Sequence, residues 1–507
     1  MQYLLAAIVV LPLLGSAAAL FPAPPGLKGR DPDQAVLRHG VVVTGVVLAL
    51  AVALAAGFDY DDPARMQATT DISWIPALGT RIHLGVDGIS LPLLVLTALL
   101  TFLCALHSYG SPPRSGGARP RAFVALILVL EAGTLATFAV LDLLLFFLAF
   151  EMVLIPMYFL IARWGGEARE RAAGKFILYT LLGSIVMLLG LLLLGLEGGT
   201  FDMMALAADN GSSIGHTTQL LAVLAIGTGL AVKTPMWPLH SWLPDAHTAA
   251  PTAGSVLLAG VLLKMGTYGL VRLPLATVPD GFARLAPVLA VCGVVGIIWG
   301  GLVCLVEREL KRLIAWSSIA HMGFVALALA SGSDTGVTAA LYANIAHGVI
   351  SALLFLVVGG LKHHWGDDDL TIPRAALRDT SPLTGFLLLV GLAAGLGLPG
   401  LAGFWGEFSA VVAALSPAGG RPAALFVVCA VVAAVGAALA AAYSLRVARL
   451  VWLGEGSEGS APPGREVLTR SELVPGALLA LAVLALGVVP GLLLAVTEPA
   501  LVGVVSR

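Results

Sequence analysis

Two lysines lie inside apolar stretches of the chain, where a charge is costly. Lys233 and Lys264 occur in GTGLAVKTPMWPLHSWLPDAHTAAPTAGSVLLAGVLLKMGTYGL. An ammonium group near the centre of a bilayer costs about 2.5 to 3.5 kcal/mol, so such a lysine is typical of an ion or proton path with a partner carboxylate. Pro235 and Pro238 remove backbone donors, and they predict a break in the helix directly after Lys233.

Glu151 is the acidic residue best placed to pair with one of these lysines. It lies well inside the apolar stretch LDLLLFFLAFEMVLIPMYFL, where an isolated carboxylate would be costly. Asp142 lies nine residues earlier, which is about 2.5 helical turns and ~13 Å in depth. The two carboxylates therefore cannot share one site. Asp142, near the outer end, is equally compatible with an interfacial residue that has no chemical role.

Composition predicts a polytopic membrane protein with an all-α fold. Of 507 residues, 58% are hydrophobic and 11% are charged, against about 25% charged in a typical soluble domain. A stretch of about 20 apolar residues can cross the ~30 Å hydrocarbon core. The chain contains fourteen such stretches, starting near residues 2, 37, 88, 121, 141, 174, 217, 251, 283, 311, 336, 383, 423 and 475. The first lacks a basic region before it, so we expect an uncleaved helix and not a secretory signal.

The distribution of basic residues predicts the orientation. If the N-terminus lies outside, 20 of the 28 Lys and Arg residues fall in inner loops and 6 in outer segments, and the remaining two are Lys233 and Lys264. Arg272 is among those assigned to the outer segments. Because inner loops of membrane proteins are enriched in Lys and Arg, we expect both termini on the outer side.

Sites for metals, nucleotides and nucleic acid are not predicted. The four cysteines are scattered over apolar stretches without metal-ligand spacing. His240 and His247 have Pro244 between them, and we expect them to be interfacial polar residues or water contacts of a short amphipathic re-entrant piece, not zinc ligands. GLGLPG, at 395–400, resembles a dinucleotide fingerprint but follows no strand, so we expect a second broken helix there. A net charge of −2 gives no reason to expect nucleic acid.

The acidic, proline-containing connection at 59–87 is expected to be an exposed outer loop without catalytic residues. Asp87, at its end, would cap the following helix, because a carboxylate suits the positive end of the helix dipole. Capping is sufficient to explain this residue.

Three blocks of the sequence resemble one known family. The blocks are KTPMWPLHSWLPDAHTAAPTAGSVLLAGVLLKMGTYGL, ELKRLIAWSSIAHMGF and GLPGLAGFWGEF. They resemble the antiporter-like membrane subunits of proton-pumping NADH:quinone oxidoreductase, respiratory complex I. The resemblance covers residues 85–490. These subunits share ancestry with multisubunit cation/proton antiporters and with membrane-bound hydrogenases.

The resemblance implies a proton relay. In the family, a glutamate of helix five pairs with the lysine of broken helix seven, and these match Glu151 and Lys233. The lysine of helix eight, which continues the path, matches Lys264. Histidines of helices ten and eleven, taken as relays, match His321 and His347. As lone polar residues in helices, these two histidines could also simply bond to neighbouring helices.

The charged residue of broken helix twelve distinguishes the types within the family. In the family this residue ends the half-channel, and it matches Glu407. Lysine is usual there in the L-like and N-like subunits and in the main antiporter subunits, whereas the M-like type has glutamate. The chain also stops soon after its fourteenth expected helix, so it resembles the M-like type. Two departures from the family pattern, Trp316 in place of tyrosine and LKHHWGDDDL in place of a Glu-Arg pair, touch no proposed relay residue.

Two broken helices, each with a charge beside the break, also suggest two five-helix units of inverted topology, as the family resemblance implies. The expected division is residues 1–120 for helices one to three, 121–272 for the first repeat with helices four to eight, 273–450 for the second repeat with helices nine to thirteen, and 451–507 for a loop and helix fourteen.

The resemblance also implies partners and cofactors. NADH, flavin, iron–sulfur clusters and quinone are expected in other subunits and none in this chain. The expected partners are the other membrane subunits, including L-like and N-like ones, in a bacterial inner membrane. A cation/proton antiporter subunit remains an alternative that should show lysine at position 407, and a membrane-bound hydrogenase subunit is another. A self-sufficient solute transporter would need a polar substrate cavity, whereas the charges here are spaced in a line.

Overall fold

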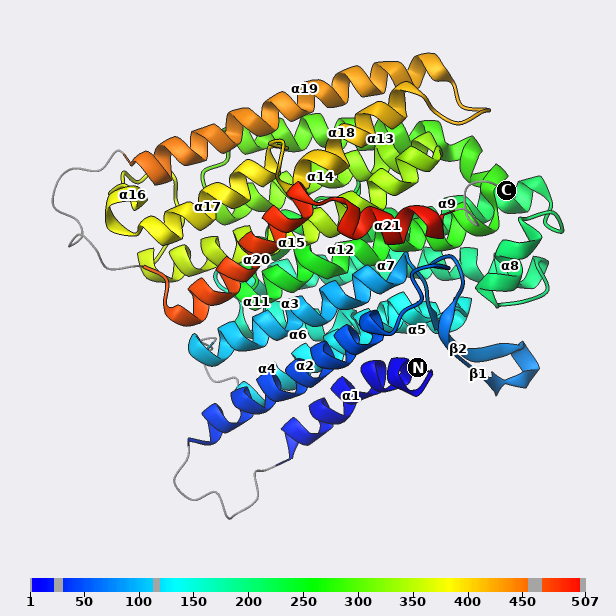
Figure 1. The fold of residues 1–507 in the computed structure, drawn as a ribbon, viewed down its shortest axis with the longest axis horizontal. Helices are drawn as coiled ribbons and strands as arrows, with labels where there is room; N and C mark the ends of the chain where they lie inside the picture. The colour runs from blue at the N-terminus through cyan, green and yellow to red at the C-terminus, as the bar shows by residue number, and fades with distance from the viewer. Residues whose placement is uncertain (1, 22–30, 113–118, 455–466, 502–507) are drawn as a thin grey trace.

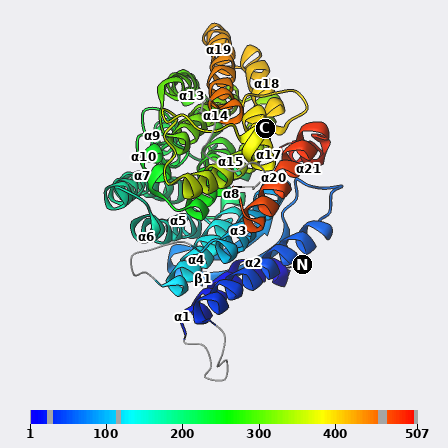
Figure 2. The same ribbon diagram turned by 90° about the vertical axis from the view of Figure 1, so that its left-hand side faces the viewer.

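The computed structural model describes residues 2–21, 31–112, 119–454 and 467–501, and most of them are helical. The helices run side by side along the long axis of the molecule, with α1 at one edge and α19 at the opposite edge (Figure 1). The view from the end shows the same order, with α1 and α2 far from α13 and α19 (Figure 2). Twelve of the described helices are long and apolar enough to cross a membrane. The expected all-α polytopic fold is confirmed, and the total of fourteen helices stays a prediction.

In chain order the elements are α1 Gln2–Leu20, α2 Pro32–Ala56, β1 Gln67–Ile75, the 3₁₀ turn η1 Pro76–Leu78, β2 Thr80–Val86, α3 Ser90–Gly110, α4 Pro120–Ala139, α5 Leu143–Met152, α6 Leu154–Trp164, α7 Arg169–Glu197, α8 Met203–Asp209, α9 His216–Lys233, α10 Trp242–Ala249, α11 Thr252–Leu257, the π turn η2 Leu258–Leu262, α12 Leu263–Leu270, the π turn η3 Val271–Leu275, α13 Pro279–Val306, α14 Leu310–Ser331, α15 Asp334–Trp365, α16 Leu377–Thr380, α17 Pro382–Gly395, α18 Ala402–Leu415, α19 Ala423–Val447, the π turn η4 Ala448–Leu453, α20 Arg470–Val488 and α21 Gly491–Ala500.

Both predicted helix breaks are confirmed. α9 ends at Lys233 and α10 begins only after the segment with the two prolines, which cannot continue the ladder of backbone hydrogen bonds. α17 ends at Gly395 and α18 begins at Ala402. Between them, Gly397 and Gly400 have φ angles of +75° and +89°, which favour glycine and stop a right-handed helix. The GLGLPG motif is thus a helix break.

The connection at 59–87 is not the simple loop that was expected. β1 and β2 pair antiparallel and form a hairpin between α2 and α3. Thr, Ile and Trp residues in β1 favour a strand. The two strands have only nine and seven residues and contain charged side chains, so no apolar stretch stood out in the sequence. The short helices α8 and α21 were not predicted either.

Arg272 is not in an outer loop, and the assignment of Asp87 to capping alone is incomplete. Arg272 lies in η3, is buried, and forms an ion pair with the buried Asp87. One oxygen of Asp87 also accepts hydrogen bonds from the backbone N–H groups of Ile89 and Ser90, so the expected cap is present. The first turn of α3 is therefore tied to the start of η3, because one carboxylate serves both elements.

The start of α1, the β1–β2 hairpin and α21 lie toward the same end of the molecule (Figure 1). This agrees with both termini lying on one side, although the side of the membrane stays a prediction. Five of the basic residues used in the orientation argument lie outside the described residues: Lys28, Arg30, Arg114, Arg465 and Arg507.

The same backbone pairing occurs twice, near α8 at one end of the molecule and near α16 at the other (Figure 1). At the first, Asp142 pairs with Asp202, and the N–H of Leu143 donates to the carbonyl of Phe201 at 2.9 Å. At the second, Glu309 pairs with Asp369, and the flanking residues bond in the same way. In the first predicted repeat, Asp142 lies just before α5 and Asp202 lies after α7. In the second, Glu309 lies just before α14 and Asp369 lies after α15. Each pairing thus joins the start of the second membrane-spanning segment of a repeat to the connection that follows the third.

Candidate functional site

Lys264 is fully buried at the beginning of α12, and its ammonium group has two neighbours in the protein interior. Nζ donates to the carbonyl oxygen of Ala259 at 2.6 Å and lies 2.5 Å from Nδ1 of His347. Ala259 belongs to η2, and such π turns inside helices are frequent at functional sites. The π turn thus comes directly before Lys264 and supplies a carbonyl that holds its ammonium group.

The contacts continue from His347, in α15, to α14 and α18. The ring centroids of His347 and His321 are 5.5 Å apart, and Nδ1 of His321 lies 2.5 Å from Oε1 of Glu407. These three side chains line a cavity of about 20 Å³, which is room for one water molecule. The four predicted residues from Lys264 to Glu407 therefore form one line.

The broken helix between α17 and α18 shapes the end of this line. A Cβ atom added to Gly397 would lie 3.1 Å from Oε2 of Glu407, and one added to Gly395 would lie 3.7 Å from Nε2 of His321. The unwound backbone at Gly397 therefore lies against the carboxylate, and Gly395, the last residue of α17, lies against the imidazole. The absence of side chains at these two positions leaves room for both groups.

Lys233 and Glu151 are near one another but do not form a contact ion pair. Lys233, the last residue of α9, is buried, and its Nζ lies 4.8 Å from the ring centroid of Phe150. Glu151 follows Phe150 in α5 and interacts electrostatically with Lys233 and with the side chain of Ser184. Among the described residues, no ion pair within 4.0 Å joins Glu151 and Lys233. The predicted pair is thus open in this structure.

α12 packs directly on the end of α9, between the two lysines. A Cβ atom on Gly266 would lie 2.3 Å from Oγ1 of Thr234, the residue after Lys233. This hydroxyl is buried and has no hydrogen-bond partner within the described part of the chain. Thr234, which the sequence did not single out, therefore lies at the contact between the two lysine-bearing helices.

His247 is fully buried inside the protein, so the expected contact with the interface or with surrounding water is wrong. α10 packs against α7 and α14. The His247 ring is fully buried and stacks on Phe355 with centroids 4.3 Å apart. Neither ring nitrogen has a hydrogen-bond partner among the residues that the structure describes. Lys264 and Lys311 both act electrostatically on this ring.

Lys311 is a buried cation that sequence reasoning had counted as a loop charge. It is the second residue of α14, and its Nζ donates to the carbonyl oxygen of Ala250 at 2.5 Å. Its backbone N–H donates to Asp368. His240 is also buried, with its ring centroid 5.5 Å from that of Trp316. No sequence signal separated Lys311 from its exposed neighbours, because all lie at the start of an apolar stretch.

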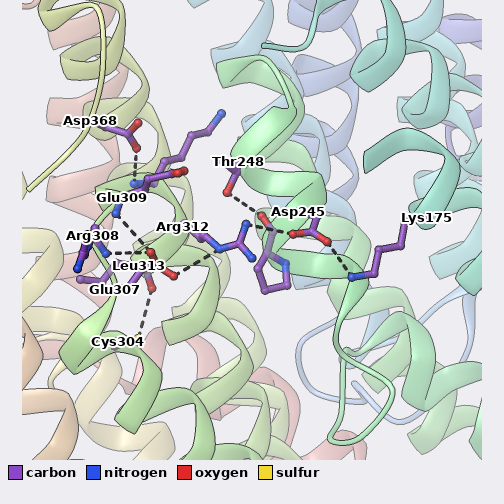
Figure 3. A network of polar contacts seen from close by, with 12 residues as sticks. Lys175, Asp245, Thr248, Cys304, Glu307, Arg308, Glu309, Arg312, Leu313 and Asp368 are labelled. Carbon is purple, nitrogen blue, oxygen red and sulfur yellow. Dashed lines mark hydrogen bonds and ion pairs between the residues drawn. The ribbon is translucent and has the colours of Figure 1, made fainter. Parts of the chain in front are cut away.

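An ionic network holds α10 in place near Lys311 (Figure 3). One oxygen of Asp245 accepts a hydrogen bond from Lys175 in α7 at 2.7 Å, and the other lies 3.0 Å from Arg312 in α14. Arg312 also lies 3.4 Å from Glu307. α10 is thereby fixed to both repeats, because Lys175 belongs to the first predicted repeat and Arg312 to the second.

The site consists of groups that exchange protons. Lysine, histidine and glutamate side chains donate and accept protons at hydrogen-bond distance. In the described ranges, no group of three His, Cys, Asp or Glu side chains could hold a metal ion. The arrangement of these groups supports passage of a proton along side chains in the protein interior.

The family model described as "NADH:quinone oxidoreductase/Mrp antiporter, TM" matches residues 140–435. NAD(P)H-quinone oxidoreductase chain 4 1 of Picosynechococcus is 38% identical, over 96% of this chain and 88% of that protein. NADH-quinone oxidoreductase subunit M of Rhodobacter capsulatus is 36% identical, over 100% of this chain and 97% of that protein. A chain of respiratory complex I from Thermus thermophilus has a similar fold, with a TM-score of 0.84, 29% identity and 98% coverage of both chains.

Proposed function

The chain belongs to the NADH:quinone oxidoreductase/Mrp antiporter family of membrane proteins, and we propose that it is the M-type proton-translocating subunit of an NADH:quinone oxidoreductase. Relatives at 36% and 38% identity over nearly the whole chain have the names subunit M and chain 4 of such enzymes. Electron transfer takes place in other subunits, so this chain acts as the non-redox part of a translocase.

One observation supports this function above the others: the line of interior contacts from Lys264 through His347 and His321 to Glu407. Lys264 and His347 are buried, and His321 and Glu407 are largely buried, with side-chain exposures of 13% and 12%. Titratable side chains inside an apolar helix bundle are costly, so their presence there indicates a function. The line also ends on a glutamate, as the resemblance to the M-like type implies, and not on a lysine.

We propose that Glu151 and Lys233 start this path. At ~4 Å and an effective dielectric constant of 20, such a pair gains about 4 kcal/mol, which falls to about 1.4 kcal/mol at ~12 Å. Moving one charge against ~150 mV costs about 3.5 kcal/mol. Closing and opening the pair therefore changes the energy by about 2.6 kcal/mol, which is of the same order as this cost and covers most of it. The open pair in this structure corresponds to the state in which Lys233 can release its proton.

From Lys233 the proposed route passes Thr234 and reaches Lys264. Lys264 then gives a proton to Nδ1 of His347, its contact at 2.5 Å. The cavity beside His321 accommodates a water molecule that can carry the proton between the two rings. His321 finally passes it to Glu407. Each step joins groups that accept and donate protons, so the side chains and one water molecule are sufficient for the route.

The repeated backbone pairing at opposite ends of the molecule supports the proposed inverted repeats, 121–272 and 273–450. Two such repeats would each present a broken helix to the centre of the membrane. We infer further that L-like and N-like membrane subunits are partners in a bacterial inner membrane, and that both termini lie outside.

The proposed function is tested by isolating the complex in mild detergent through a tag on this chain. Its partners are identified by mass spectrometry, and NADH:quinone activity is assayed on the same sample. Subunits with flavin and iron–sulfur clusters, together with that activity, are the expected result. Recovery with small antiporter subunits only, or with a nickel–iron hydrogenase, would contradict the NADH chemistry.

A further inference from the structure

An apolar groove runs between α1, α4 and α6, away from the proton path. It has a volume of about 700 Å³. Leu20, Leu126, Val129 and Phe159 are among the residues that line it, and Leu20 and Phe159 are exposed. None of the residues proposed to carry protons lines this groove. An inference about it is therefore independent of the proposed function.

Three arginines lie at one end of the groove. Arg119 is the residue before α4, Arg163 lies in the last turn of α6, and Arg169 is the first residue of α7. Glu170 is the single acidic residue in the lining. This end of the groove therefore has an excess of positive charge, on the side where the basic residues of the chain concentrate.

The apolar part of the groove has the depth of one lipid leaflet. From Arg119 to Val129, α4 advances ten residues, or about 15 Å at 1.5 Å per residue. The hydrocarbon core of a bilayer is ~30 Å thick, so half of it is also about 15 Å. A guanidinium cluster at one end and an apolar channel one leaflet deep match the two parts of a lipid molecule.

We propose that this groove binds an anionic phospholipid of the inner leaflet. The phosphate of the headgroup lies among Arg119, Arg163 and Arg169, because guanidinium groups bind phosphate oxygens with paired hydrogen bonds. One acyl chain lies along Leu126, Val129 and Phe159. Basic pockets between transmembrane helices on the cytoplasmic side are a known type of site for such headgroups. A neutral lipid would fill the same channel but gain nothing from the arginines.

The test uses the intact complex, purified through a tag on this chain and reconstituted in phosphatidylcholine vesicles. One sample contains a trace of phosphatidylglycerol with a photoactivatable group on its acyl chain, and the other contains phosphatidylcholine with the same group. After illumination, labelled peptides of this chain are mapped by mass spectrometry. We expect labels at Leu126, Val129 or Phe159 with the anionic lipid, and far fewer with the neutral one.

Variants then test the role of the charges. Replacing Arg119, Arg163 and Arg169 by Gln should weaken labelling by on the order of 100-fold, because each basic residue near an anionic headgroup contributes about a fivefold gain in binding. Arg171→Gln is the control, since Arg171 is exposed near the start of α7 but does not line the groove. Co-purification of the partner subunits checks that the triple variant still folds.

Three outcomes would overturn the proposal. Equal labelling by both lipids would mean that the groove holds bulk lipid only. Cross-links from the groove to a neighbouring subunit, without lipid labels, would mean that a protein covers it. Unchanged labelling in the triple variant would remove the arginines from the site. The comparison of the two lipids in the unmodified protein needs no variant, so a folding defect cannot leave the proposal untested.

Discussion

Nδ1 of His321 lies 2.5 Å from Oε1 of Glu407, although the two residues are 86 positions apart in the chain. Two helices and a broken segment meet at this contact: α14 supplies the histidine, α18 the glutamate, and the unwound Gly397 packs against the carboxylate. The contact ends the line of side chains that begins at Lys264. Its disruption should therefore affect proton movement more than electron transfer.

Glu407→Gln should slow proton transfer through this subunit by roughly 100-fold, the lower range of what a proton-transferring side chain contributes, so the complex should lose the protons that this subunit translocates. The amide keeps the size and a hydrogen bond but cannot take a proton from His321. Proton uptake into vesicles and NADH oxidation are measured on the same reconstituted complex. Phe408→Leu, at the neighbouring exposed position, is the control and should pump normally. Normal pumping by Glu407→Gln would remove this residue from the path.

The variants Gly397→Ala and Gly400→Ala distinguish two effects of the broken helix. One effect is the backbone strain of a non-glycine residue at a positive φ angle, and the other is the contact of residue 397 with Glu407. Both glycines have positive φ angles, so each substitution should cost roughly 1 kcal/mol of stability. A Cβ at 397 would also lie 3.1 Å from the Glu407 carboxylate, whereas nothing lies within 4 Å at 400. We therefore expect both variants to melt earlier, and only Gly397→Ala to lose pumping. Equal losses of pumping would contradict the proposed contact.

Arg272→Gln tests the buried ion pair that the sequence did not predict. Removing one partner of such a pair leaves an uncompensated charge and typically costs 3–5 kcal/mol. The expected result is a clear fall in the melting temperature of the complex or loss of this subunit from it. Arg284→Gln, at an exposed site in α13, should stay within about 0.5 kcal/mol of the parent protein. Equal stability of the two variants would show that the Asp87 contact contributes little.

His83 and Asp202 predict a pH dependence of the docking between the hairpin and α8. His83 Nδ1 donates to Asp202 at 2.7 Å. The hydrogen bond with Asp202 raises the pKa of His83, and hydrogen bonds with His83 and the start of α8 lower the pKa of Asp202 despite its burial. A raised histidine pKa stabilises the folded state below the unfolded value of about 6.5, and this gain is lost as the pH rises through the folded pKa.

The lowered pKa of Asp202 acts in the opposite direction. It stabilises the folded state above about pH 3.9, the unfolded pKa of an aspartate, and this stabilisation is lost as the pH falls through the folded pKa. The pair should thus stabilise the protein most between about pH 4 and 6.5. Melting temperatures of the parent protein and His83→Gln, measured from pH 5 to 9, should differ at the acid end and converge at the alkaline end. A constant difference would contradict the predicted titration.

Much of the fold and of the site could be predicted from the sequence, for physical reasons that also explain the errors. A helix that crosses a bilayer must be apolar over about 20 residues, so the spans and the charges inside them stand out. Lys264 is visible in this way. Lys311 and Arg272 lie at the ends of such stretches, where a buried cation and a loop cation have the same sequence context.

Contacts between helices were less accessible to sequence reasoning. Glu151 and Lys233 both lie within apolar stretches, but their separation depends on the rotation and tilt of α5 and α9, which the sequence pattern alone does not fix. For the same reason, nothing in the sequence indicated that Thr234 would lie against Gly266. The family resemblance supplied the relay residues, and the structure supplied which of them touch.

The most direct test of the proposed relay is the number of protons translocated per NADH oxidised by the reconstituted complex with Lys264→Ala. Lys264 has the central position, because its Nζ contacts His347 and it follows Lys233 in the proposed route. Met265→Leu, a volume-conserving change at the next buried position, is the control. We predict that Met265→Leu keeps the full ratio and that Lys264→Ala, assembled in the complex, loses the protons that this subunit translocates. An unchanged ratio with Lys264→Ala would contradict the relay.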